Sequence, residues 1–180
     1  MRALIRYRKH YARRTSGLTL VEMTVMIVLI AIVATMGARL IGESSQSFSA
    51  ADNIAEVGWQ GRIALERMEK EIRATAGTAG ITTWTASTLT ITSTSGTSIG
   101  YTLAGTTLQR TQAPTAAPQP QPLADYVSSL GFTYWDRNGA QVIPGIGSVN
   151  TIYYITVTVG IGKGGFTNTY RTTIYPENFL

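Results

Sequence analysis

The chain has 180 residues, no cysteine, one histidine and a formal net charge of +5. This length suffices for one domain with a modest core, and the absence of cysteine excludes disulfides, CxxC-type metal sites and a cysteine nucleophile. Residues 1–17 hold six basic side chains, no acid and the single histidine, so the rest of the chain has nine basic and ten acidic side chains, a formal charge of −1 before the termini. A broad basic surface for nucleic acid is therefore disfavoured there.

A long apolar segment follows the basic one. Residues 23–38 carry no charge, and with the stretch from Leu18 they give about 20 residues, enough to cross a bilayer as a helix. The preceding basic residues, Arg13 and Arg14 nearest, predict a cytoplasmic N-terminus and an exported remainder. A secretory signal peptide would need small residues around a later cleavage site, which residues 35–37 supply poorly. A plain signal anchor would not explain Glu22, because a charge inside a bilayer costs roughly 2.5–3.5 kcal/mol.

The helical pattern continues beyond the apolar segment, from Arg39 to about Ala76, without a proline. Apolar or small residues at spacings of three and four predict a buried face formed by Ile54, Val57, Gly61, Leu65, Met68 and Ile72. Oppositely charged residues stand at i,i+4 on the other faces, as in Arg67/Glu71 and Glu69/Arg73, and each such pair adds about 0.2–0.5 kcal/mol. Gly77 and Gly80 are expected to end the helix.

From Ile81 onward, threonine and serine alternate with apolar residues, which predicts strands. The alternating sets that share a strand face are Leu89 and Ile91, then Ile99, Tyr101 and Leu103, and later Tyr153, Ile155, Val157, Val159 and Ile161. Leu108 marks another short strand, and Phe132, Tyr134 and Trp135 mark a further one. Residues 112–122 hold four prolines and are assigned no regular structure. Residues 136–139 form a turn signal, and residues 161–165 a glycine-rich hairpin loop before a last strand over 166–175. The expected fold is α+β, with one long helix packed on an antiparallel sheet.

The junction between the two N-terminal segments, RRTSGLTLVE over residues 13–22, resembles the processing site of type IV pilins and type II secretion pseudopilins. The resemblance implies that a prepilin peptidase cuts between Gly17 and Leu18 and methylates the new N-terminus, and that Glu22 becomes the fifth mature residue. Leu18 departs from the family, which usually has phenylalanine there. The resemblance to this family also implies a pilin-like fold with three parts: a leader over residues 1–17, a transmembrane and assembly helix over 18–38, and a periplasmic domain over 39–180.

Two later segments resemble the larger minor subunits, namely J-type pseudopilins and W-type or O-type minor pilins. Residues 62–73, RIALERMEKEIR, fit their helix pattern, and residues 122–136, PLADYVSSLGFTYWD, fit a later strand, preceded by Leu108-Gln109-Arg110. The implied function is a minor subunit that helps start or tip a pilus or pseudopilus. Glu22 would neutralise the N-terminal amine of a neighbouring subunit. Alternatively, this carboxylate reaches the membrane interface beside the helix end.

The implied partners are the peptidase, other pilin subunits and, before assembly, the inner membrane. A small-molecule substrate, a cofactor and a resident metal are not expected. An alternative is a binding subunit displayed on a fibre for adhesion or DNA uptake, although the mature charge of −1 disfavours DNA. An enzyme is the weakest hypothesis, because no nucleophile, base or metal set stands out.

Four other features have a structural and a functional interpretation. Asp125 and Asp136 could be a metal pair, but they are eleven residues apart and lack the pattern of a calcium loop. The Gly160–Gly165 stretch lacks the spacing of a phosphate loop, so a hairpin is favoured. Core packing is favoured over a sugar platform for the tryptophans, which are Trp59, Trp84 and Trp135. Adjacent Tyr153 and Tyr154 must point to opposite faces of a strand, so one ring could serve as a contact surface.

Overall fold

The computed structural model describes residues 17–113 and 119–179. Arg13 and Arg14 lie outside these residues. The chain divides into two compact units, Met1–Ser47 and Phe48–Leu180, and each is described by itself. The expected boundary at residues 38 and 39 falls inside a helix, and the packed unit begins at Phe48.

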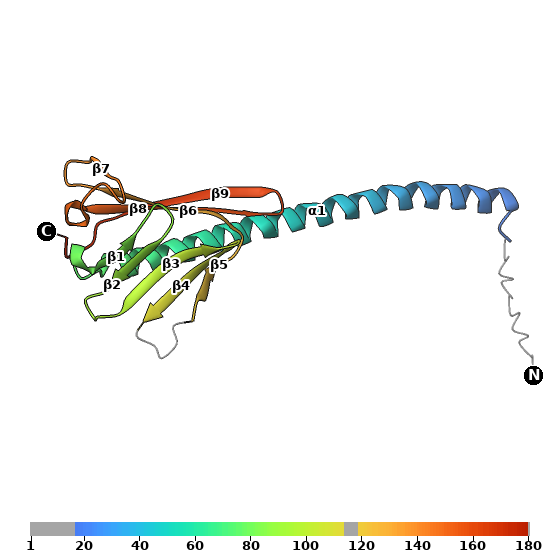
Figure 1. Ribbon diagram of the computed structural model, residues 1–180. Coiled ribbons are helices and arrows are strands. Elements are labelled where there is room, and N and C mark those ends of the chain that lie inside the picture. Colours follow the sequence, from blue (N-terminus) through green and yellow to red (C-terminus); the bar gives the residue numbers. More distant parts are fainter. Residues whose placement is uncertain (1–16, 114–118, 180) are drawn as a thin grey trace, which may run out of the picture. The chain divides into compact units, whose positions relative to one another are not determined.

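Helix α1 (Leu20–Arg73) is 54 residues long and begins in the first unit (Figure 1). Its apolar side chains there, from Leu20 to Ile41, are exposed. By length and composition it is the one helix of the described chain that could cross a membrane. This finding is consistent with a single-pass membrane protein. The helix ends three residues before the predicted end at Ala76.

In the second unit, one face of α1 is buried. The buried residues are Val57, Gly61, Ala64, Met68, Glu71 and Ile72. The predicted face is therefore largely confirmed, but Ile54 is 54% exposed and Leu65 is only partly buried. The helix packs at a slightly different rotation from the predicted one, which brings Ala64 and the carboxylate of Glu71 inward.

The strands form two antiparallel sheets, where the sequence predicted one. The five-stranded sheet has the order β1-β2-β3-β4-β5, and the four-stranded sheet has the order β7-β6-β8-β9. Figure 1 shows the C-terminal part of α1 running beside both sheets. The strands are β1 (Ile81–Trp84), β2 (Leu89–Thr92), β3 (Ser98–Ala104), β4 (Thr107–Ala113), β5 (Gln121–Ala124), β6 (Val127–Trp135), β7 (Gln141–Val142), β8 (Tyr154–Lys163) and β9 (Phe166–Ile174); the short 3-10 helices are η1 (Thr78–Gly80) and η2 (Val149–Thr151).

The alternating pattern of the strands is confirmed by their burial. On β8, Ile155, Val157, Val159 and Ile161 are fully buried, and on β3 Tyr101 is fully buried as well. The core lies between the helix and the two sheets and contains residues from all three. The α+β class is thus confirmed.

The proline-rich stretch over 112–122 is shorter than predicted. Strand β4 continues to Ala113, and β5 begins at Gln121 and includes Pro122. Proline is tolerated in β5 because this is an edge strand: on its outer side no neighbouring strand needs a hydrogen bond from the backbone N–H that proline lacks.

Strand β7 pairs only with Tyr134 and Trp135 of β6, and loops of the other sheet form hydrogen bonds with the earlier part of that edge. The backbone N–H of Val127 donates to Thr106 O at 2.8 Å, and that of Phe132 donates to Ala86 O at 2.8 Å. These bonds join the two sheets into one unit, because the β1–β2 and β3–β4 connections complete the hydrogen bonding of a strand in the other sheet.

Candidate functional site

The predicted processing junction lies at the start of α1. Gly17, Leu18 and Thr19 are non-helical and exposed, and the helix begins at Leu20. The Gly17–Leu18 peptide bond therefore lies in open backbone, where no hydrogen-bonded helix would have to unwind before a peptidase could reach it.

Glu22 has a local role that was not predicted from the sequence. The Glu22 backbone N–H donates to Thr19 Oγ1 at 3.3 Å, and the Thr19 backbone N–H donates to Glu22 Oε2 at 3.4 Å. This reciprocal pair is a capping box, which satisfies two N–H groups that a helix start leaves without partners. The signal was present in the sequence as Thr19-x-x-Glu22. A structural reason for the carboxylate thus stands beside the expected pairing with a neighbour's amine.

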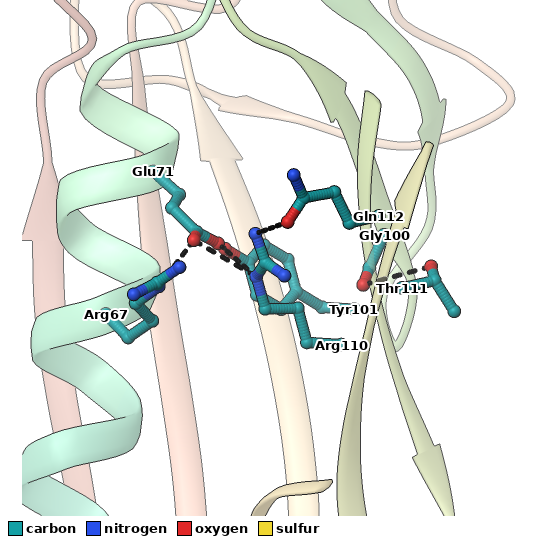
Figure 2. Close-up of polar contacts among 7 residues, drawn as sticks. All are labelled: Arg67, Glu71, Gly100, Tyr101, Arg110, Thr111 and Gln112. Atoms are coloured by element: carbon teal, nitrogen blue, oxygen red, sulfur yellow. Dashed lines mark hydrogen bonds and ion pairs between the residues drawn. The ribbon is translucent and has the colours of Figure 1, made fainter. Parts of the chain in front are cut away.

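A second polar cluster, which we call the polar clamp, joins α1 to the five-stranded sheet. It consists of Arg67, Glu71, Tyr101, Arg110 and Gln112 (Figure 2). The Arg110 Nε–H donates to both oxygens of Glu71 at 2.8 and 3.0 Å, and the Tyr101 hydroxyl donates to Glu71 Oε2. From the helix itself, Arg67 Nε donates to the other oxygen at 2.5 Å. Arg110 Nη2 also donates to Gln112 Oε1 at 2.8 Å.

The Glu71–Arg110 pair at the centre of the clamp is buried, whereas Arg67 lies at its exposed side. Side-chain exposure is 7% for Arg110 and 10% for Glu71, against 53% for Arg67. Burial alone would raise the pKa of Glu71, but hydrogen bonds from Arg110, Tyr101 and Arg67 outweigh burial and hold that pKa below its ordinary value. Burial, followed by the contact with Glu71, raises the pKa of Tyr101. The cluster therefore holds a carboxylate, two guanidinium groups and a neutral phenol at physiological pH.

The clamp acts as a structural attachment, because its carboxylate is saturated by three donors. A buried ion pair that loses one partner leaves an uncompensated charge, so the pair fixes the position of the helix on the sheet. Three of its five residues come from segments already singled out for resemblance: Arg67 and Glu71 from residues 62–73, and Arg110 from the Leu108–Arg110 stretch. From the sequence, Arg110 could be placed on the same strand face as Leu108, two residues earlier, but Glu71 was assigned to a charged face of the helix.

The two aspartates considered as a metal pair are far apart in the fold. Asp125 precedes β6 and accepts a hydrogen bond from Thr107 Oγ1 at 3.0 Å, whereas Asp136 follows β6. The nine residues of that strand separate them by roughly 30 Å. Within residues 17–113 and 119–179, no three His, Cys, Asp or Glu side chains gather as a metal site would require.

The glycine-rich stretch is the hairpin between β8 and β9, as predicted. Its turn is shorter than expected, because Lys163 pairs with Phe166 and only Gly164 and Gly165 remain between the strands. Both glycines have positive φ, at 59° and 85°, which a two-residue turn of type I′ requires. No helix follows, so the geometry of a phosphate loop is absent from this part of the described chain.

The packing prediction is wrong for Trp59. This side chain lies on α1 and is 66% exposed, because the helix buries the opposite face. Trp84 is partly buried and meets Tyr134 edge-on, with ring centroids 5.2 Å apart. Trp135 stacks on Tyr154 at 5.9 Å, and its Nε1–H donates to Thr156 Oγ1 at 3.1 Å.

Comparison with known proteins adds no assignment. Neither a scan of the sequence against protein-family models nor a search of curated proteins gave a match. The geometry defines an α+β protein with antiparallel sheets and one N-terminal helix that is long and apolar enough to cross a membrane.

Proposed function

We propose that the protein is a minor pilin or pseudopilin, a structural subunit that helps start or tip a type IV pilus or a type II secretion pseudopilus. The observation that carries the proposal is the junction over residues 13–22, with Gly17 and Glu22 in register at the start of an apolar helix. That helix continues without a break into the packed face of an α+β unit, and this arrangement supports the proposal further.

The proposed mechanism follows from the chemistry of the junction. The helix holds the subunit in the inner membrane, with the leader in the cytoplasm and the α+β unit in the periplasm. A prepilin peptidase removes residues 1–17 and creates an α-amine on Leu18. During assembly, Glu22 pairs with the amine of a neighbouring subunit, because opposite charges in a low dielectric are tolerable together and costly apart.

Cleavage is the first test. Co-expression with a prepilin peptidase should shorten the chain by the 17 residues of the leader, leaving Leu18 first. Gly17→Val should block the shift, because a β-branched side chain should not fit where the peptidase takes glycine. Mass spectrometry that finds an intact leader on the wild-type chain, or a cut near Gly37, would refute the processing proposal.

The role of Glu22 needs a pair of variants, because the capping box gives this residue a second function. Glu22→Gln keeps the capping box, since glutamine also serves at this position, but it removes the charge. Glu22→Ala removes both. If charge pairing drives assembly, both variants should be processed normally and both should fail to join a fibre.

Incorporation of Glu22→Gln but not Glu22→Ala would show that capping is the role of this side chain and would contradict pairing. Thr19→Ala is the matched control, because it removes the reciprocal hydroxyl contact and leaves the carboxylate in place. The measurements are the processed mass, the amount in the membrane and the amount in sheared fibres.

A further inference from the structure

A hollow of about 260 Å³ lies at the end of the four-stranded sheet where β6 finishes and β8 begins. It is lined by residues 136–138 in the β6–β7 turn and by residues 150–153 in and after η2. Its volume is below the roughly 300–1,000 Å³ of pockets that hold drug-sized ligands, so it suits one small ring. The proposed fibre function makes no use of it.

Both walls of the hollow are fixed by hydrogen bonds. Asp136 Oδ1 accepts from the backbone N–H groups of Asn138 at 2.9 Å and Ala140 at 2.7 Å. On the other wall, the Thr151 hydroxyl donates to Ser148 O at 2.7 Å. A ligand would therefore meet a formed site and would avoid much of the cost of ordering loops on binding.

A guanidinium group stands at this hollow. The Arg137 Cζ atom lies 5.1 Å from the centroid of the Tyr153 ring, and that ring packs edge-on against Tyr175 at 6.1 Å. Arg137 is exposed and forms no ion pair within the described ranges 17–113 and 119–179. A guanidinium held on an aromatic face presents a planar set of donors that matches a carboxylate.

A carboxylate lies beside this cation. Asp136 uses Oδ1 in the turn, and Oδ2 has no hydrogen-bond partner among the residues that the structure describes. The amide side chains of Asn138 and Asn150 add donors and acceptors to the lining. A simple anion could pair with Arg137 but has no donor for Asp136, and an apolar ring could form a hydrogen bond with neither group. A ligand that carries both a carboxylate and hydroxyl donors satisfies the two groups together.

We propose that this hollow binds an acidic sugar, with the ligand carboxylate on Arg137 and ring hydroxyls donating to Asp136. The proposal does not rest on the fibre function, because it concerns binding by the chain itself, whether or not the leader is removed. The two adjacent tyrosines and Trp135 contribute by holding the walls, since Trp135 stacks on Tyr154 and Tyr154 contacts Tyr175 at 5.1 Å.

The test is a titration of the full chain in detergent micelles, followed by ligand-observed NMR with D-glucuronate as the probe. We expect saturable binding at millimolar concentration. Arg137→Gln should weaken binding at least about ten-fold, the loss expected for one charge-assisted contact. Asn150→Ala should weaken it less. Arg171→Gln is the matched control, because Arg171 is exposed on β9, outside the hollow, and should bind as the wild type does.

Competing ligands decide the chemical class. D-glucose lacks the carboxylate, acetate lacks the ring and hydroxyls, and L-alanine tests whether an ammonium and a carboxylate suffice. Equal binding by any of the three would overturn the assignment to acidic sugars. No saturable binding of D-glucuronate, or equal weakening by Arg137→Gln and Arg171→Gln, would overturn the site itself. Circular dichroism of each variant establishes that it is folded before it is titrated.

Discussion

Removing one charged partner from the polar clamp should strongly destabilise the second unit, because the other charge would be left buried and unpaired. Glu71→Gln keeps the size of the side chain but removes its charge. It leaves the guanidinium of Arg110, whose side chain is 7% exposed, without a carboxylate. Breaking a buried pair in this way costs about 3–5 kcal/mol. Because glutamine keeps one oxygen that can accept hydrogen bonds, we expect a loss near 3 kcal/mol, from a total of about 5–15 kcal/mol for a domain.

The assay is equilibrium urea unfolding of a chain beginning at Phe48, followed by circular dichroism. Glu66→Gln is the control, since Glu66 is exposed on the same helix and such a change should alter stability by less than about 0.5 kcal/mol. A double change, Glu71→Leu with Arg110→Met, removes both buried charges and should recover much of the loss. Equal effects of Glu71→Gln and Glu66→Gln would refute the reasoning.

The same variant should change the dependence of stability on pH. The pKa of Glu71 is lowered from its ordinary value of 4.5 in the folded protein. The unfolded state therefore binds the proton more readily. The stabilisation is fully present above about pH 4.5 and is lost as the pH falls through the lowered folded-state pKa. The gap between wild type and Glu71→Gln should be constant near neutral pH and should shrink in acid. A gap that widens in acid would contradict the ionised state of Glu71.

Three further predictions concern the helix. A Cβ at Gly61 would lie 2.3 Å from ring atoms of Tyr170, whereas one at Gly58 would lie 3.8 Å from the Tyr170 hydroxyl oxygen. Gly61→Ala should thus lower the free energy of unfolding by about 1–3 kcal/mol through overpacking, while Gly58→Ala should raise it by up to about 1 kcal/mol. Thermal unfolding that ranks the two variants the other way would contradict this packing. A chain beginning at Phe48 should be soluble with mixed helix and strand, because the exposed apolar run is removed and the buried face is kept; a fully helical or unfolded circular dichroism spectrum would count against it. Thr19→Ala should loosen only the first turn of α1, at a cost of about 0.5–2 kcal/mol, seen as faster amide hydrogen exchange near Glu22 with unchanged exchange around Glu71.

The elements with strong periodicity could be predicted from the sequence, whereas their pairing could not. The alternation of Ile155, Val157, Val159 and Ile161 gave the strand and its buried face correctly. The division into two sheets depends on which edges meet, as at Val127 and Phe132, and alternation along one strand carries no such information. Trp59 was misjudged because large apolar residues are usually buried, while its burial depends on the rotation of the helix.

The polar clamp was missed for a related reason. The i,i+4 spacing of Arg67 and Glu71 predicts an ion pair of the kind that is common on helix surfaces. That contact exists, but the same carboxylate also meets Arg110, 39 residues later in the chain. Only the tertiary structure makes this contact, and the predicted buried face of the helix did not include Glu71. The capping box of Thr19 and Glu22, by contrast, was readable from spacing alone.

The attachments of α1 within the second unit also bear on how that unit would respond to force. Asn53 contacts the β8–β9 hairpin at Gly164, Gly61 receives the ring of Tyr170, and Glu71 joins β3 and β4 through the clamp. A pull along the helix axis at Phe48 would load these three places together, in shear, and they would have to fail at nearly the same time. A pull across the axis would open them one after another, starting at Asn53. The unit should therefore be mechanically stiff along its helix and much weaker when peeled, a difference that single-molecule pulling from residue 48 against two different anchor points would measure.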